Sequence, residues 1–326
     1  MQRAIDLAAS VRSTTSPNPW VGAVLEATDA TIHDGATEPA GGAHAEIVAL
    51  AHAGERARGA TLWTTLEPCS HQGRTPPCTE AILAAGVARV VVGVSDPDPK
   101  VAGQGIEQLR AAGVEVTVGV QAASVEHQLA PYLKHRRTGR PWVVLKLASS
   151  LDGRTAAPDG TSRWITGPEA RADAHRLRAE SDAVVVGAGT VRTDDPALTV
   201  RHGIAGDDPL RVVLGRVPAG ARVLPALELD GPLPGVLDDL GGRGVVQALV
   251  EGGATVAGAF HRAGLVDRYV LYQAPALFGG DDGRGVFAGA GAATMADVWR
   301  GHITAVTSLG DDLRIDLEPF AAKGEH

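Results

Sequence analysis

Three side chains in the first quarter of the chain could hold a metal ion, and a fourth could move protons beside it. His44 and Glu46 stand two residues apart in HAEIVALAHAG, residues 44–54, and Cys69 and Cys78 follow further along. One imidazole and two thiolates form the ligand set that a tetrahedral zinc ion prefers, and three protein ligands leave one coordination position open. Because an open position lets zinc lower the pKa of water, the set indicates a catalytic metal site.

Glu46 is the natural proton carrier of this site. A carboxylate there can take a proton from the attacking water and pass it to a leaving amine, which is the chemistry of a hydrolytic deaminase. H-x-E followed by a Pro-Cys pair is the signature of the zinc nucleobase deaminases, but two residues separate their cysteines. Here eight residues separate Cys69 from Cys78, so the sequence predicts a deaminase with a long insertion.

Two predicted helices position these ligands. Apolar residues within 47–51 recur at helical spacing, so His44 is expected at the start of a helix. Cys78 follows two prolines and precedes TEAILAAG, which places it at another helix N-terminus. Free N–H groups and the helix dipole favour a thiolate at such a position.

The surrounding pattern predicts two α/β domains joined by a linker. From residue 1 to 120, strands alternate with helices, which predicts parallel pairings. Residues 121–140 are basic and less patterned, and we expect them to form the linker. The alternation restarts over residues 141–322. The basic linker residues are expected to form a solvated face rather than an anion-binding or nucleic-acid-binding patch: Lys134, His135, Arg136, Arg137 and Arg140.

Composition argues against several classes of partner. The 326-residue chain is 44% hydrophobic and carries a formal net charge of −8, which disfavours nucleic acid and anionic membranes. No segment has the uninterrupted apolar length of a membrane span, and the first residues lack the apolar region of a signal peptide. We therefore expect a cytoplasmic protein with reduced cysteines, and the apolar content would accommodate a homo-oligomer.

The string TLEPCSHQGRTPPC, which contains both cysteines, closely resembles the bifunctional riboflavin biosynthesis deaminase-reductase family. TTSPNPWVGAV and GGAHAEIVAL continue the resemblance in the first half, and LKLASSLDGRTAAPDGTSRWIT and LRAESDAVVVGAGTVRTDDPALTVR extend it into the second. The resemblance implies an N-terminal cytidine-deaminase-like three-layer domain and a C-terminal dihydrofolate-reductase-like α/β domain. It implies deamination of 2,5-diamino-6-(5-phosphoribosylamino)pyrimidin-4(3H)-one, followed by NADPH-dependent reduction of the ribosyl group to ribityl.

The resemblance also implies substrate-binding residues in both halves. In the deaminase half these are Asn18, His71, Arg74 and Asp96, while Asp98 occupies a position where asparagine is commoner in the family. Asn18, Asp96 and Asp98 could also cap turns beside prolines. In the reductase half the implied residues are Lys146, Ser150, Asp152, Trp164, Thr166, Arg178, Arg201 and Glu251, with Asp195 as the catalytic acid that assists sugar-ring opening. The two arginines suit a ribose phosphate because a guanidinium binds two oxygens at once.

Two glycine turns are the predicted NADPH site. VVVGAGTV and ALVEGGATVAGAF each pass from a strand through glycine into a helix, where backbone N–H groups can meet a phosphate. Neither is a complete G-x-G-x-x-G motif, so a standard Rossmann site is not expected. The candidate cofactor-binding residues are Gly187, Gly189, Thr190, Gly252 and Gly253.

One departure from the family leaves alternatives open. Between Arg201 and Val250 the chain is shorter than the resemblance predicts, and we expect a strand with its flanking loop to be absent. The first alternative is therefore a deaminase with a degenerate reductase domain. The others are a nucleoside or transfer RNA deaminase fused to another domain, and a non-catalytic binding protein descended from the enzyme.

Overall fold

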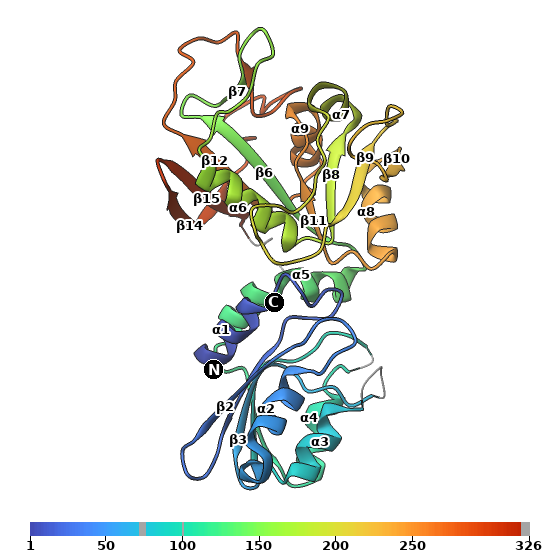
Figure 1. Ribbon diagram of the computed structural model, residues 1–326, viewed down its shortest axis with the longest axis vertical. Coiled ribbons are helices and arrows are strands. Elements are labelled where there is room, and N and C mark those ends of the chain that lie inside the picture. Colours follow the sequence, from blue (N-terminus) through green and yellow to red (C-terminus); the bar gives the residue numbers. More distant parts are fainter. Residues whose placement is uncertain (72–75, 100, 321–326) are drawn as a thin grey trace. The chain divides into compact units, whose positions relative to one another are not determined.

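A computed structural model describes residues 1–71, 76–99 and 101–320 (Figure 1). The chain divides into two compact units, Met1–Arg140 and Pro141–His326, each with its own sheet. Within the described ranges, no helix combines the length and apolar character needed to cross a bilayer.

The first unit contains a five-stranded sheet. Its strands are β1 (Gly22–Glu26), β2 (Ile32–Ala36), β3 (Thr61–Leu66), β4 (Arg89–Val94) and β5 (Glu115–Val118), in the order β2-β1-β3-β4-β5. The predicted parallel pairing holds for β3, β4 and β5. Strand β1 instead runs antiparallel to both β2 and β3, and β2 is a strand that the sequence pattern did not predict.

Helices cover both faces of this sheet. They are α1 (Gln2–Ser10), α2 (Ala45–Ala53), α3 (Cys78–Ala85), α4 (Gln104–Ala111) and α5 (Ala122–Thr138), with the short 3-10 helix η1 (Gly54–Ala57) after α2. The backbone at Gly22 approaches α1, whereas the backbone at Gly35 approaches α2. Gly22 pairs with Ala36, the residue after Gly35, so these two approaches lie on opposite faces. Helix α5 contacts α1, and α3 contacts both α2 and α4, which gives the predicted three layers (Figure 1).

The predicted linker, residues 121–140, contains α5, and this helix belongs to the first unit. Val125, Leu129, Tyr132 and Leu133 recur at helical spacing and are buried. Pro131 lies inside the helix, where it provides no N–H donor, and basic residues follow it. The proline and the basic residues make the apolar face of this helix difficult to recognise in the sequence. The structure places the boundary between the units after Arg140.

The second unit contains an eight-stranded sheet and a small two-stranded sheet. The larger sheet has the order β10-β9-β8-β11-β6-β12-β15-β14, and the smaller pairs β13 with β7. The strands are β6 (Trp142–Ser150), β7 (Arg154–Ala156), β8 (Ala183–Gly187), β9 (Leu210–Leu214), β10 (Leu227–Leu229), β11 (Gln247–Val250), β12 (Arg268–Ala274), β13 (Arg284–Gly285), β14 (Gly301–Leu309) and β15 (Asp312–Pro319). From β10 to β12 neighbouring strands are parallel, whereas β15 and β14 are antiparallel additions.

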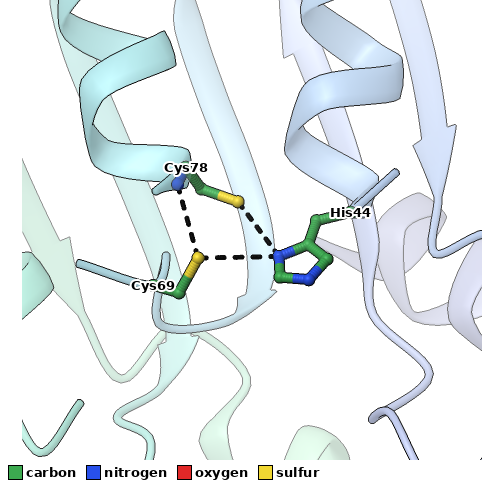
Figure 2. A group of neighbouring side chains, drawn as sticks. All are labelled: His44, Cys69 and Cys78. Atoms are coloured by element: carbon green, nitrogen blue, oxygen red, sulfur yellow. Dashed lines mark hydrogen bonds between the residues drawn. The ribbon is translucent and has the colours of Figure 1, made fainter. Parts of the chain in front are cut away.

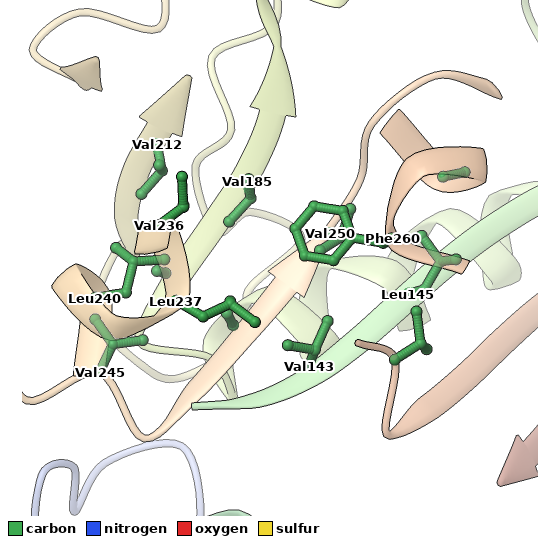
Figure 3. Close-up of a cluster of buried hydrophobic side chains, with 14 of the residues drawn as sticks. Val143, Leu145, Val185, Val212, Val236, Leu237, Leu240, Val245, Val250 and Phe260 are labelled. Atoms are coloured by element: carbon green, nitrogen blue, oxygen red, sulfur yellow. The ribbon is translucent and has the colours of Figure 1, made fainter. Parts of the chain in front are cut away.

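Alternation along the strands builds a core on each face of the larger sheet. The helices are α6 (Pro168–Ala179), α7 (Ala188–Asp194), α8 (Leu233–Gly242) and α9 (Ala254–Arg262). Val143 and Leu145 of β6 pack with Leu240 of α8 and Phe260 of α9 (Figure 3). Val144, between them in sequence, belongs to the other core with residues of α6. Each strand therefore serves two cores, as the two-residue period of a strand requires.

The segment that the sequence predicts to be shortened holds three complete elements and most of a fourth. Strands β9 and β10 and helix α8 lie between Arg201 and Val250, and β11 ends at Val250. Of these, β10 and α8 were not among the predicted elements. The absence of one further strand relative to the family stays a prediction.

We expect Leu240→Ala to destabilise the second unit by about 2–5 kcal/mol, because it leaves a cavity in a fully buried core. The matched control is Leu277→Ala, at a side chain that is 71% exposed, where the change should stay within about 0.5 kcal/mol. Urea unfolding of both variants measures the difference. Equal midpoints would contradict the assignment of this core.

Candidate functional sites

The first unit contains a cavity of about 400 Å³ that is lined by His44 and Cys69, two of the three predicted metal ligands. Its lining also includes Glu46, Asn18 and Asp96. Two metal ligands, the proposed proton carrier and two implied substrate-binding residues therefore share one cavity. This is the arrangement that a small-molecule site requires.

The three predicted ligands converge on one point (Figure 2). The His44 Nδ1 atom lies 3.2 Å from the Sγ of Cys78 and 3.6 Å from the Sγ of Cys69, and all three ligand atoms lie within 4.8 Å of one another. Ligand bonds of about 2.0–2.3 Å arranged tetrahedrally around zinc separate the ligand atoms by roughly 3.5 Å. The donor set and its spacing therefore fit a zinc ion.

The local structure explains why these residues point together. His44 is the N-cap of α2 and has an extended backbone, so its side chain does not lie on the helix surface, whereas Glu46 lies in the first turn of the helix. Cys78 is the first residue of α3, and its backbone N–H donates to the Sγ of Cys69 over 3.3 Å. Both predicted helix starts are confirmed, and both present positive dipole ends to the thiolates.

The ionisable groups of this cluster perturb one another strongly. The hydrogen bond from the Cys78 thiol is the main reason that the pKa of Cys69 falls to about 4. The pKa of Cys78 is raised, first by the same hydrogen bond and then by burial. The hydrogen bond with Cys69 raises the pKa of His44. Burial raises the pKa of Glu46 to about 7, in the range suited to a group that takes up and releases protons.

Glu67, which the sequence reasoning missed, holds the cavity wall together. Its buried carboxylate accepts four backbone N–H bonds, from Asp96 and Gly103 on Oε2 and from Gly105 and Ile106 on Oε1. It thereby ties the loop that leads to Cys69 to the loop before α4 and to the first turn of that helix. Its place in TLEPC, just before a ligand, was the available signal.

Most of the other residues predicted to bind substrate in the deaminase half line the cavity. Asn18, His71 and Asp96 all line the cavity, and so does Asp98. Burial raises the pKa of Asp96, whose carboxylate accepts a hydrogen bond from the Tyr132 hydroxyl at 3.0 Å. Arg74 lies outside the described residues. Two lining residues, Tyr132 and Arg136, come from the segment that was predicted to be a linker.

In the second unit, three of the predicted residues form one charged group. Arg178 binds Glu251 through two parallel contacts, Nε to Oε1 at 2.6 Å and Nη2 to Oε2 at 2.8 Å. Burial alone would raise the pKa of Glu251, but the Arg178 guanidinium outweighs it and holds that pKa at about 2. Burial lowers the pKa of Lys146, and the nearby Glu251 carboxylate acts in the opposite direction and raises it. The fork of Arg178, predicted to bind a phosphate, therefore faces a carboxylate instead.

The other residues predicted to bind substrate in this unit differ in their contacts and their exposure. Ser150 donates to Asp152 over 2.5 Å, which is the main reason that the pKa of Asp152 falls to about 2. Trp164 is 70% exposed, and the Thr166 carbonyl accepts a bond from Arg171.

The predicted catalytic acid and the second predicted phosphate ligand are both exposed. Asp195 is the C-cap of α7, and its side chain accepts the backbone N–H of Arg222. The backbone N–H of Arg201 donates to His175 Nδ1. Burial lowers the pKa of His175 to about 4, so its ring is a neutral acceptor at neutral pH.

The two predicted glycine turns lie next to each other. Strands β8 and β11 are parallel neighbours, so Gly187, the last residue of β8, and Gly252, which follows β11, lie at the same edge of the sheet. The Gly253 N–H donates to Thr190 Oγ1 over 3.3 Å, which links the two turns. A Cβ at Gly252 would lie 2.5 Å from the Cβ of Val256, so this position requires glycine. Beyond its chain neighbours and its own helix backbone, no atom of the described residues lies within 4 Å of a Cβ built on Gly189, which leaves room beside that turn for a cofactor.

Comparisons with known proteins match both units. Residues 1–94 match the cytidine and deoxycytidylate deaminase zinc-binding region, and residues 141–313 match the RibD C-terminal domain. The riboflavin biosynthesis protein RibD of Escherichia coli is 40% identical over 359 residues, covering 97% of this chain and 98% of that protein. The chain belongs to the RibD family. RibD of Mycobacterium tuberculosis is 44% identical over 335 residues, covering 97% of this chain and 96% of that protein.

Solved structures of the RibD family have the same fold. Acinetobacter baumannii RibD superposes with a TM-score of 0.92 at 40% identity, covering 98% of this chain and 97% of that one. A Thermotoga maritima diaminohydroxyphosphoribosylaminopyrimidine deaminase/5-amino-6-(5-phosphoribosylamino)uracil reductase gives 0.90 at 34% identity, with the same coverage. The two-domain fold class is confirmed, and the family favours the bifunctional interpretation over a nucleoside or transfer RNA deaminase.

We expect Glu67→Gln to lower the free energy of unfolding by about 1–3 kcal/mol, because its amide group would face two backbone N–H donors that lose their acceptor. Glu107→Gln, at an exposed position of the same helix α4, is the control and should unfold like the wild type. Urea unfolding of the zinc-loaded proteins measures both. A Glu67 variant as stable as the control would contradict this role.

Proposed function

We propose that this chain catalyses two consecutive steps of riboflavin biosynthesis. The first removes the ring amine of 2,5-diamino-6-(5-phosphoribosylamino)pyrimidin-4(3H)-one by hydrolysis, and the second uses NADPH to reduce the ribosyl group to ribityl. The observation that carries the proposal is the convergence of His44, Cys69 and Cys78 at a cavity that Glu46 also lines, in a chain that also has a RibD C-terminal domain.

In the deaminase half, His44, Cys69 and Cys78 hold the zinc ion. When bound, zinc supplies a Lewis acid that activates water near neutral pH. Glu46 accepts a proton from the attacking water and donates it to the departing amine. Asn18, together with His71 and Asp96, binds the pyrimidine by hydrogen bonds from the cavity wall, with Arg74 at the phosphate. Glu67 keeps this wall in position.

In the reductase half, Gly187, Gly189, Thr190, Gly252 and Gly253 form the proposed NADPH-binding turns. NADPH supplies the hydride for C1 of the opened ribose, and the protein aligns the two reactants. Lys146 and Glu251 bind the ribosyl group, Asp195 supplies the acid for ring opening, and Arg201 binds the phosphate. Ser150, Asp152, Trp164 and Thr166 complete the proposed substrate-binding residues.

Arg178 acts differently from the role predicted from the sequence. Its two contacts with Glu251 fix that carboxylate, and a further bond from Nη1 to the Thr199 carbonyl holds the guanidinium itself. We therefore assign it to orienting Glu251. A carboxylate fixed in this way keeps its charge and its direction toward the sugar.

Mass spectrometry of the products tests the function directly. Zinc-loaded protein is incubated with the diaminopyrimidinone phosphoribosyl substrate, with and without NADPH. We expect a deaminated product without NADPH and a deaminated, reduced product with it. Deamination alone under both conditions would favour the degenerate-reductase alternative, and an unchanged substrate in both would refute the proposal.

Glu46→Gln should lower the rate of deamination by roughly a hundredfold to ten-thousandfold, because glutamine cannot transfer the proton. The variant should retain its zinc, which metal analysis measures, because all three ligands are intact. Reduction of the already deaminated intermediate with NADPH is the internal control and should continue. Normal deamination by this variant, or by protein stripped of zinc, would contradict the assignment.

The proposed partner beyond the substrate is a second copy of the chain. Strand β14 ends the eight-stranded sheet, and its side chains are mostly exposed, including Ile303 at 59% and Val306 at 57%. An apolar edge strand is a surface that proteins usually pair or protect. Nucleic acid and membranes are not proposed partners. The proposed compartment is the cytoplasm, where thiolate ligands stay reduced.

Light scattering coupled to gel filtration tests the homo-oligomer. At micromolar concentration we expect the wild type to have at least twice the mass of the chain, and Ile303→Lys to shift it toward the monomer, because a lysine opposes pairing of this edge. Met295→Lys, at another exposed apolar side chain outside β14, is the control and should leave the mass unchanged. A monomeric wild type would refute this part of the proposal.

A further inference from the structure

Arg136 of α5 lines the deaminase cavity. Among the described residues that line this cavity it is the one lysine or arginine. Its neighbour Arg137 is exposed, so the basic run in this segment is not uniformly a solvated face. One turn of α5 therefore delivers a single guanidinium to the cavity wall.

The guanidinium of Arg136 contacts several side chains. It packs over the Tyr132 ring, with its carbon 4.9 Å from the ring centre, and its Nε lies 3.5 Å from Oδ2 of Asp98. Its Nη1 lies 3.5 Å from Nδ1 of His135. The side chains of Arg136 and Asp98 are 29% and 23% exposed. At this partial burial a charge is screened less than on an open surface, so the pair is electrostatically significant.

The Nε of Arg136 is also an orphaned donor. It is buried and has no hydrogen-bond partner among the described residues, because the contact with Asp98 is an ion pair that lacks hydrogen-bond geometry. Buried donors in native proteins are nearly always satisfied, by protein, water or ligand. An unsatisfied guanidinium donor at a cavity wall indicates that an acceptor from a ligand belongs there.

Several carboxylates line the same cavity as Arg136. They are those of Glu46, Glu67, Asp96 and Asp98. An anionic substrate that approached these carboxylates without a nearby cation would be repelled. Asp98 adds a further negative charge to this wall, which increases the need for compensation. Arg136 is placed to provide it.

We propose that Arg136 is a specificity-determining residue of the deaminase site that binds the phosphate of the substrate and so favours phosphorylated over unphosphorylated compounds. The inference rests on the proposed function, because it takes the phosphoribosyl compound as the substrate. A planar guanidinium can bind two phosphate oxygens at once, and it keeps its charge at every physiological pH.

The test compares two substrates by ammonia release in the absence of NADPH. One is the phosphoribosyl compound and the other is its riboside, which lacks the phosphate. In Arg136→Gln the ratio of the two kcat/KM values should fall at least about tenfold, the effect of losing a charge-assisted hydrogen bond, mainly through KM for the phosphorylated compound. Arg137→Gln is the matched control and should keep the wild-type ratio. Zinc content shows that each variant is intact.

Two further variants separate phosphate binding from other roles. Arg136→Lys keeps the charge without the planar fork and should recover part of the ratio, and it also serves if the glutamine variant does not fold. Adding Asp98→Asn to Arg136→Gln should leave the ratio low. Restoration of the wild-type ratio by this double change would overturn the proposal, because Arg136 would then act only by neutralising Asp98. An equal loss for both substrates, or no loss, would also overturn it.

Failure of the proposed function is distinguishable from failure of this inference. If the wild type releases ammonia from neither compound, the proposed deamination is wrong. Calorimetric titration of the zinc-loaded protein with the phosphorylated compound then decides the role of Arg136. The proposal requires Arg136→Gln to lose one binding event or to weaken it at least about tenfold. Identical titrations for the variant and the wild type would overturn it.

Discussion

The first unit depends on bringing one imidazole and two thiols from three separate segments to the same point. His44 precedes α2, Cys69 follows β3 and Cys78 begins α3, and their ligand atoms lie within 4.8 Å of one another. Concentrating such groups is favourable only if positive charge is present to stabilise thiolates. The N-termini of α2 and α3 supply part of this positive charge, and a bound zinc ion would supply the rest.

Both units use a buried carboxylate that is saturated with donors to set the geometry of a site. Glu67 accepts four backbone N–H groups, and Glu251 receives two contacts from Arg178. A buried charge costs much free energy unless it is paired and hydrogen-bonded, so each carboxylate can occupy essentially one position. The loops and strands that carry the hydrogen-bond donors are fixed together with the carboxylate. The neighbouring site is therefore rigid as well.

Helix α5 shows how an element can be hidden in a sequence and still complete a site. Its buried positions, such as Val125 and Leu129, follow helical spacing, but Pro131 and the basic residues after it obscure that pattern. Once folded, the helix places Tyr132 on Asp96 and Arg136 beside Asp98. The segment that resembles a linker therefore supplies part of the deaminase wall.

The sequence by itself identified the candidate metal ligands, the candidate proton carrier and the starts of both ligand-bearing helices, because these depend on residue types and on local spacing. It also determined the order of most strands and helices through local periodicity. Only the tertiary structure decided what Glu67, Tyr132 and Arg136 contact, and that Arg178 faces Glu251. Arg178 and Glu251 are 73 residues apart in the sequence, and Tyr132 and Asp96 are 36 residues apart. No local pattern specifies such pairings, since they arise when packing brings distant segments together.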